Sequence, residues 1–125
     1  MAVHPSPEIV VQRQLDAYNA RDMEALLATY APDAQHYEHP AKLVASGHAQ
    51  MRERFALRFA EPNLHARLVK RCVMGDTVID YEDIRRTFPE GPGRIELVAI
   101  YQVRAGRIHT ASFLAGAKTL DTPAQ

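Results

Sequence analysis

Cysteine is nearly absent from this 125-residue chain, with Cys72 as its one copy. A single cysteine cannot form an internal disulfide, and the strand-like setting of Cys72 indicates a small core or interface side chain rather than a reactive thiol. An excess of either charge is also missing, because 15 lysines and arginines balance 15 aspartates and glutamates. This balance gives no electrostatic reason to expect nucleic acid or an anionic membrane as a partner.

Several sequence motifs are missing as well. The chain contains no glycine-rich phosphate loop, no Gly-x-Ser-x-Gly run and no Cys-x-x-Cys pair, so nucleotide binding, serine hydrolase chemistry and a zinc site lack support. No apolar run has the length of a signal peptide, and none approaches the roughly 20 residues that a membrane span needs. We therefore expect a cytoplasmic protein without a membrane partner, a metal or a cofactor.

Helix signals occupy the first half of the chain. Residues 6–8 combine a serine N-cap, a proline at the first helical position and an acid in the first turn. Asp22 can cap a second helix, which we expect to end before Pro32. A third helix opens at 46–47 and closes at 61–63, where a proline stops it. These signals predict three helices.

The second half of the chain has the period of strands. We predict a short strand at 34–38, a loop at 41–45 that is either a lid or a connection, and long strands at 65–74, 77–88, 94–103 and 107–114. Glycine in each turn between the long strands favours hairpins, and hence an antiparallel meander. Helices followed by such a sheet predict one α+β domain with a loose tail at 118–125.

The third strand of the meander is apolar on both faces. Alternation places Ile95, Leu97, Ala99 and Tyr101 on one face, and Glu96, Val98, Ile100 and Gln102 on the other. The helices can cover one face only. We therefore expect a homodimer that packs sheet to sheet through the other face.

This order of elements, together with the runs at 18–26, 30–34, 46–47 and 105–108, resembles the nuclear transport factor 2-like superfamily. More narrowly, it resembles the branch that holds ketosteroid isomerases and SnoaL-like polyketide cyclases. The resemblance covers about residues 6–116. It implies three N-terminal helices packed on a curved, mainly antiparallel sheet, a cystatin-like cone with a mostly apolar internal pocket, and usually a dimer.

The catalytic groups of ketosteroid isomerases do not carry over. By this resemblance, His39 replaces the general-base aspartate, Gln14 the oxyanion-binding tyrosine, Ala99 the protonated aspartate and Phe55 a supporting tyrosine. Only Tyr30 matches a tyrosine of the isomerase network. Without these donors, steroid isomerisation would lose its largest electrostatic contribution. We therefore do not predict a steroid isomerase.

His39 is the strongest single candidate for proton transfer, because imidazole titrates near neutral pH. By the same resemblance, Asp80 and Glu82 point into the pocket, where either could orient His39, and the hydroxyl of Tyr30 could reach it. The opposite strand alternation would leave both carboxylates on the surface. The alternative for His39 is a strand-end histidine that bonds backbone or water.

Other polar clusters have simpler interpretations. His36 and Glu38 alternate to the face opposite His39, so these three side chains cannot easily converge on one metal ion. The arginines at 52–58 and the basic residues at 70–71 and 85–86 are interleaved with acids or apolar residues, which favours solvated faces.

The superfamily pocket suggests a set of substrate-binding residues: Gln14, Tyr18, Phe55, Phe59, Leu97, Ala99, Tyr101, His109 and Phe113. The two tyrosines 18 and 101 fit the core as well, and His109 fits a hydrogen-bonded sheet position. We expect a cofactor-free isomerase, cyclase, hydratase or lyase that acts by proton transfer on a small apolar or aromatic molecule. The alternative, favoured by the lost isomerase groups, is a non-catalytic small-molecule-binding or dimerisation module.

Overall fold

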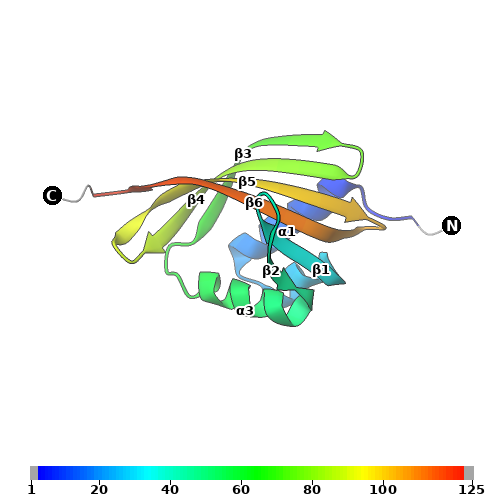
Figure 1. The fold of residues 1–125 in the computed structure, drawn as a ribbon, viewed down its shortest axis with the longest axis horizontal. Coiled ribbons are helices and arrows are strands. Elements are labelled where there is room, and N and C mark those ends of the chain that lie inside the picture. The colour runs from blue at the N-terminus through cyan, green and yellow to red at the C-terminus, as the bar shows by residue number, and fades with distance from the viewer. Residues whose placement is uncertain (1–2, 123–125) are drawn as a thin grey trace.

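The computed structural model describes residues 3–122 and consists of three helices on one side of a six-stranded sheet (Figure 1). The helices are α1 (Pro7–Ala20), α2 (Met23–Ala28) and α3 (Gly47–Phe59). The strands are β1 (Tyr30–Glu38), β2 (Lys42–Ser46), β3 (His65–Met74), β4 (Thr77–Phe88), β5 (Gly91–Arg104) and β6 (Arg107–Leu120). The predicted α+β class, with helices packed on a curved and mainly antiparallel sheet, is confirmed.

The helices begin at the predicted caps. The Ser6 hydroxyl accepts a hydrogen bond from the Ile9 amide at 3.3 Å, and the Asp22 carboxylate accepts one from the Ala25 amide at 3.1 Å. Arg21, in the left-handed conformation, ends α1. No helix in residues 3–122 is long and apolar enough to cross a membrane.

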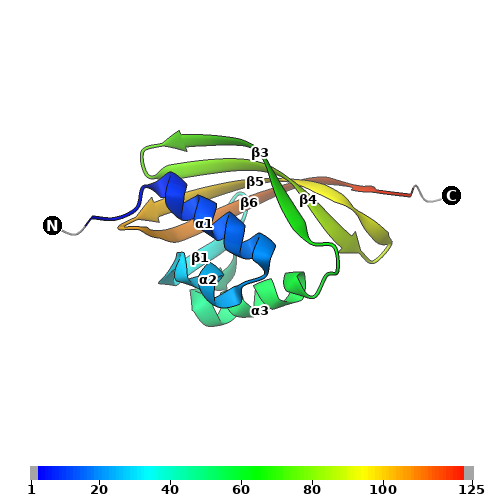
Figure 2. The same ribbon diagram turned by 180° about the vertical axis from the view of Figure 1, so that it is seen from behind.

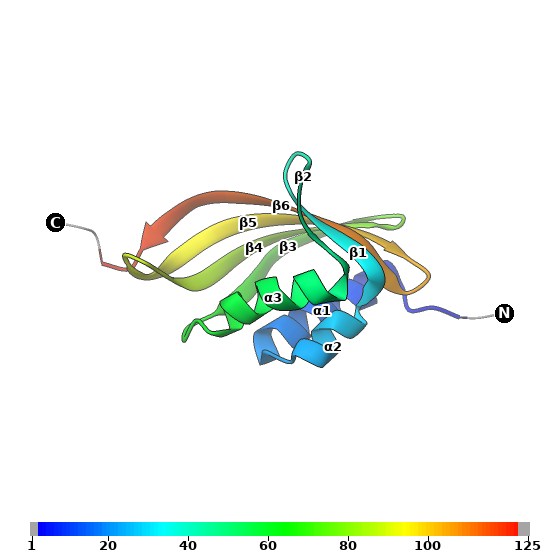
Figure 3. The same ribbon diagram turned by 60° about the horizontal axis from the view of Figure 1, so that its bottom comes forward.

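The sheet has the strand order β2-β1-β6-β5-β4-β3, in which β1 and β6 are parallel and all other neighbours are antiparallel. It curves over the helices (Figure 3), and α1 crosses its inner face (Figure 2). The main core lies between these layers and contains fully buried side chains from helices and strands, among them Leu26, Met51, Val78 and Ile108. One end of the curved sheet extends beyond this core.

The segment after α2 differs from the prediction. The helix ends before Pro32 as predicted, at Ala28, but β1 begins at Tyr30 rather than at residue 34. Pro32 is tolerated in β1 because it lies between Tyr30 and Gln35, where the register with β6 is interrupted and no backbone donor is needed. The predicted loop at 41–45 is mostly strand, since β2 folds back on β1 as a hairpin.

The C-terminal segment is also more ordered than predicted. Strand β6 pairs with β5 as far as Leu120, so the loose tail expected from residue 118 was placed too early. A side chain at Gly93 would collide with the Thr119 carbonyl oxygen. The absence of a side chain there allows the two backbones to approach closely. Residues 123–125 of the expected tail lie outside the described residues.

Candidate active site

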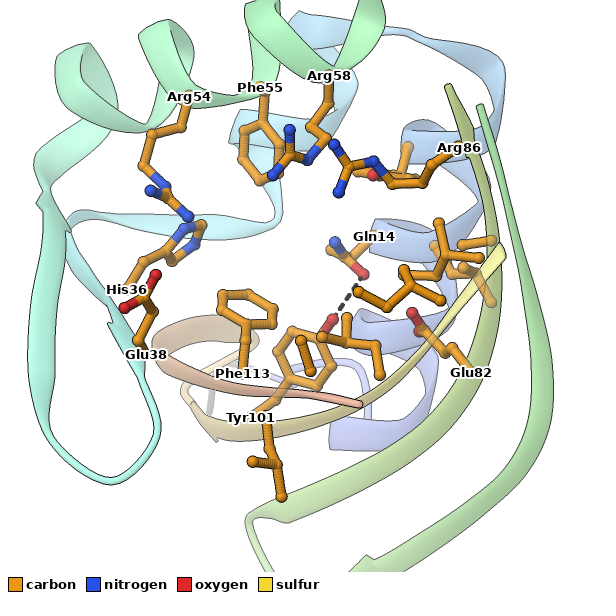
Figure 4. A pocket seen from close by; sticks show the side chains of 18 of the residues that line it. Gln14, His36, Glu38, Arg54, Phe55, Arg58, Glu82, Arg86, Tyr101 and Phe113 are labelled. Carbon is orange, nitrogen blue, oxygen red and sulfur yellow. Dashed lines mark hydrogen bonds between the residues drawn. The ribbon is translucent and has the colours of Figure 1, made fainter. Parts of the chain in front are cut away.

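A cavity of about 420 Å³ lies between α1, α3 and the inner face of the sheet (Figure 4). Its apolar wall includes Leu15, Phe55, Ile84, Ile95, Leu97 and Phe113. Polar side chains from five elements interrupt this wall: Gln14, Tyr18, His36, Glu38, Arg54, Arg58, Glu82, Arg86 and Tyr101. A mostly apolar cavity of this size with a few convergent polar groups is typical of a small-molecule site.

Glu82 is the one deeply buried carboxylate on the cavity wall. It projects from β4, is 4% exposed, and receives no hydrogen bond from any residue in the described range 3–122. Burial, with a smaller contribution from the Asp80 charge, raises the pKa of Glu82 to about 7, although Arg71 opposes the shift. Glu82 can therefore accept or donate a proton near neutral pH.

Asp80 shares the inner face of β4 with Glu82 but does not border the cavity. It is fully buried, and its two carboxylate oxygens accept hydrogen bonds from Arg71 Nε at 2.7 Å and Nη2 at 2.9 Å. Arg71 also donates to Gln12 on α1. The expectation that Asp80 orients His39 therefore needs correction, because both oxygens are occupied by a structural ion pair.

His36 of β1 is a cavity residue that the sequence interpretation missed. It is 2% exposed, and its ring packs edge-on against Tyr30, Phe55 and Phe113 at centroid distances of 5.0, 5.5 and 5.3 Å. Burial and the Arg54 charge lower the pKa of His36 to about 4, so the imidazole is neutral at pH 7. Its Nε2 atom has no hydrogen-bond partner among the described residues. Strand alternation from the apolar Ala34, two positions earlier, was the available sequence signal.

His39 lies just past the end of β1, at the rim of the cavity, and is exposed. Its backbone amide donates to the Phe113 carbonyl at 2.8 Å. Within the described chain, no hydrogen bond joins its ring to Asp80 or Glu82. The structure thus places His39 and Glu82 at one cavity without bringing them into direct contact.

Tyr30 does not border the cavity and contacts the ring of His36. It is 1% exposed, and burial raises its pKa well above the ordinary value. Its hydroxyl meets no partner at hydrogen-bonding geometry in the described chain, although the Gln14 side chain lies nearby. The expected contact with His39 is therefore wrong, because Tyr30 precedes the stretch of β1 that reaches the rim.

Most of the predicted substrate-binding residues border the cavity: Gln14, Tyr18, Phe55, Leu97, Tyr101 and Phe113. Three do not. Phe59 packs behind the rings of Tyr18 and Phe55, and Ala99 is fully buried in the core. His109 lies near the β5–β6 turn, with Nδ1 3.3 Å from Arg104 Nη2. These three corrections follow from tertiary packing, which neither helical spacing nor strand alternation reveals.

Two neutral side chains form a hydrogen bond inside the cavity. The Tyr101 hydroxyl donates to Gln14 Oε1 at 3.3 Å (Figure 4). Burial and the neighbouring Glu82 raise the pKa of Tyr101 well above its ordinary value, so this hydroxyl keeps its proton. Burial likewise raises the pKa of Tyr18 to about 12. The cavity therefore offers neutral hydrogen-bond donors opposite one titratable acid.

Three arginines gather at the mouth. Arg54 and Arg58 project from α3 and Arg86 from β4 (Figure 4). The predicted solvated face holds for Arg54, which is exposed, but Arg58 and Arg86 are partly buried, and all three side chains border the cavity. Arg54 and Arg58 flank Phe55 on the stripe of α3 that also carries the buried Met51, and this helical spacing was the signal that could have revealed them.

Comparisons with known proteins agree with this architecture. A family profile described as "SnoaL-like domain" matches residues 11–110. No curated protein matches the chain in sequence.

Solved structures show the same fold at low sequence identity. A cystatin-fold protein from Novosphingobium aromaticivorans is 22% identical, with a TM-score of 0.79 over 87% of this chain and 97% of that one. Wild-type IdmH, a proposed polyketide cyclase from Streptomyces antibioticus, is 20% identical, with a TM-score of 0.76 over 89% and 92%. A Catenulispora acidiphila protein with a ketosteroid isomerase-like fold, solved with trimethylamine, is 19% identical, with a TM-score of 0.73 over 87% and 85%.

Proposed function

The chain belongs to the SnoaL-like domain family, within the nuclear transport factor 2-like superfamily, and on that premise we propose that it is a cofactor-free, homodimeric, cytoplasmic enzyme. Its reaction is of the isomerase or cyclase type, in which a proton moves to or from carbon in a small apolar or aromatic substrate. The family and the cavity support small-molecule processing in general. The choice of reaction depends on the chemistry of the cavity wall.

The observation that carries the proposal is Glu82, a buried carboxyl without a partner in the described chain and with a pKa raised to about 7. Near neutrality, its carboxylate form can remove a proton from a carbon next to a carbonyl group. Proton return at a second carbon completes an isomerisation, and attack of the resulting enolate on a second carbonyl closes a ring.

Neutral donors on the cavity wall support the same chemistry. Charge develops on the substrate oxygen as the proton leaves, and prearranged donors stabilise it. The Gln14 amide nitrogen is one such donor, since the Tyr101 hydroxyl holds the amide oxygen, and His36 Nε2 is a second when that atom carries the imidazole proton. His39 at the rim is the second candidate for proton transfer, as a carrier between the cavity and water.

An assay that does not require the natural substrate tests the proposal. In 5-nitrobenzisoxazole, a base removes the hydrogen at C3 while the N–O bond breaks, and the electron pair ends on a coloured phenolate oxygen. We expect the rate to rise with pH, with a midpoint near 7, because only the ionised Glu82 is a base. We expect Glu82→Gln to reduce the rate at pH 8 by about 100-fold.

Two variants serve as comparisons in this assay. Glu53→Gln changes an exposed acid on α3 that does not border the cavity and should keep the wild-type rate. His39→Gln separates the rim histidine from Glu82: a large loss there, with the melting temperature within a few degrees, would transfer the proton-carrying role to His39. A Glu82→Gln variant with full activity would refute the proposed base.

A non-catalytic binding module is the alternative, and the isomerase positions support it. Gln14, Ala99 and Phe55 occupy places where ketosteroid isomerases carry catalytic groups, and only two of these residues border the cavity. Ligand binding without any Glu82-dependent proton transfer would favour this alternative.

The proposed dimer forms through the outer face of the sheet. Ile79, Val98 and Ile100 are only partly buried there, and Tyr81 and Cys72 are exposed. A second copy of the chain would cover these apolar side chains. Light scattering should give twice the 14.0 kDa mass of the chain, and Ile100→Lys should give the monomer. A monomeric wild-type protein would remove the dimer from the proposal.

A further inference from the structure

Positive charge is concentrated on one side of the cavity mouth. Arg54 and Arg58 extend from α3 over the cavity and meet Arg86 from the end of β4, whereas Glu82 lies across the cavity from Arg54 (Figure 4). A guanidinium group that is partly buried, as in Arg58 and Arg86, is stabilised by a nearby anion, whereas the exposed Arg54 is also solvated by water. The protein compensates the charges of these three arginines to different extents.

Arg86 is compensated within the protein. Its Nε donates to Glu61 Oε1 at 3.0 Å and its Nη2 to Oε2 at 2.8 Å, a two-point ion pair. The Thr87 amide also donates to Glu61 Oε1 at 3.0 Å. This arrangement anchors the segment after α3 to β4 and engages both oxygens of Glu61.

Arg58 is much less well compensated. Its nearest acid is Glu61 Oε2 at 3.5 Å, the oxygen that Arg86 already holds. Burial and the adjacent Arg86 charge lower the pKa of Arg58, which means that its cationic form is disfavoured where it stands. An anion beside Arg58 would remove that penalty.

Arg54 forms no ion pair with any residue in the range 3–122, although Arg52 on the same helix pairs with Glu24 at 2.6 Å. The remaining acids at the cavity do not compensate it. Glu38 is exposed at the rim and lies 3.7 Å from Lys42, and Glu82 is about half protonated at pH 7. Arg54 therefore faces the cavity without a carboxylate partner in the described chain, and Arg58 shares its one carboxylate with Arg86.

Between the two charged sides lies an aromatic passage. Phe55 hangs from α3 between Arg54 and Arg58, and Phe113 lies on the opposite wall, with the neutral Tyr101–Gln14 pair beside it (Figure 4). A ligand that spans the cavity thus meets cations at one end, aromatic rings along its body and a proton-transfer group at the other end.

From this arrangement we propose that the substrate is an aromatic or alicyclic carboxylate whose carboxylate group binds Arg58 and Arg54 at the mouth. The planar guanidinium fork matches the two oxygens of a carboxylate. The ring system then lies between Phe55 and Phe113, with its reacting carbon towards Glu82. This inference deepens the proposed function and rests on it for the direction of the reaction, but not for the binding of the anion.

Isothermal titration calorimetry with two matched probes tests the inference. The probes are 2-naphthoate and 2-naphthalenemethanol, which share a ring system and differ in the anionic group. We expect the wild-type protein to bind the carboxylate about tenfold more tightly than the alcohol, and Arg58→Gln to abolish that preference by weakening carboxylate binding alone. Arg58→Lys should keep part of the preference because it keeps the charge.

Arg52→Gln is the matched control, since Arg52 lies on the same helix but pairs with Glu24 outside the cavity. It should bind both probes as the wild-type protein does. Equal affinity of the wild-type protein for both probes, no binding of either probe, or equal effects of Arg58→Gln and Arg52→Gln would overturn the inference.

The elimination assay separates this inference from the proposed function. The benzisoxazole probe is uncharged, so Arg52→Gln, which lies outside the cavity, should retain its turnover while Glu82→Gln loses it. A carboxylate preference without Glu82-dependent elimination would refute the proposed reaction and keep the anion site. The reverse result would keep the reaction and refute the anion site.

Discussion

Asp80 and Glu82 stand two residues apart on the same face of β4, and yet their environments are opposite. Asp80 is fully buried and held by two hydrogen bonds from Arg71, whose side chain is 9% exposed. Glu82 is almost as deeply buried, borders the cavity and has no partner in the described chain. Burial alone therefore does not decide the role of a carboxylate. The residue that lies opposite it on the neighbouring strand decides whether it is paired.

The register of the sheet explains the difference. On β3, Arg71 lies opposite Asp80, whereas Leu68 lies opposite Glu82. On β5, Leu97 lies opposite Glu82. Cross-strand neighbours are the main source of side-chain partners in a sheet. Glu82 therefore lies between two leucines, and its carboxyl group is free to interact with a ligand in the cavity.

The largest effect is expected from breaking the Asp80 ion pair. Asp80→Asn leaves the Arg71 charge buried without a carboxylate, and we expect the free energy of unfolding to fall by about 3–5 kcal/mol. Urea unfolding at pH 7 measures this loss. The double variant Arg71→Met, Asp80→Leu should recover most of it, since an apolar pair needs no compensation. A loss below about 1 kcal/mol in Asp80→Asn would contradict a structural role for the pair.

A somewhat smaller effect is expected from the titration of Glu82. Its pKa rises from an ordinary 4.5 to about 7 in the folded protein, so between these values the folded state holds a proton that the unfolded state has lost. Stability therefore falls as pH rises through this window. We expect Glu82→Gln to gain about 3 kcal/mol relative to wild type between pH 4.5 and 7, with no further change above pH 7.

Urea unfolding of both proteins at several pH values checks this expectation. The difference between the two curves isolates Glu82 from other titrating groups, among them His36, whose lowered pKa makes stability fall in acid. A difference that does not depend on pH would mean that Glu82 titrates normally.

The smallest effect is expected from giving Glu82 the kind of neighbour that Asp80 has. Leu68→Arg places a cation opposite Glu82 on β3 and should lower the midpoint of the elimination rate profile by about one pH unit. The pH dependence of benzisoxazole turnover measures this shift. Leu68→Met, which adds no charge, should leave the midpoint near 7, and the same midpoint in both variants would refute the argument from register.

Most of the fold was predictable because its signals are local. The caps at Ser6 and Asp22 and the glycine turns of the meander act within a few residues of their positions. Strand β2 and the last part of β6 were missed because pairing with another strand, and not a local sequence pattern, holds them extended. The partner of β2 is β1, and that of β6 is β5. The curvature of the sheet was predicted from the resemblance to the superfamily, which the family match confirms.

The site was predictable in part. Glu82 and six of the expected lining residues border the cavity, because strand alternation and the superfamily pocket both indicate one inner face. His36 was assigned to the wrong face because the count started from His39, which lies past the end of β1, where alternation no longer applies. The Arg71–Asp80 pair depends on register between strands, which no local pattern contains.

The division of the cavity between α3 and β4 has a consequence for how such a protein can diversify. Two of the three arginines at the mouth, Arg54 and Arg58, sit on a surface helix, whereas Glu82 sits on β4 of the six-stranded sheet. Leu57, on the same helix, is exposed and also borders the cavity. Substitutions at Arg54, Leu57 and Arg58 can therefore retune substrate choice without disturbing the scaffold that sets the acidity of Glu82. A combinatorial library confined to these three positions is the economical starting point for directed evolution of new specificities on this fold.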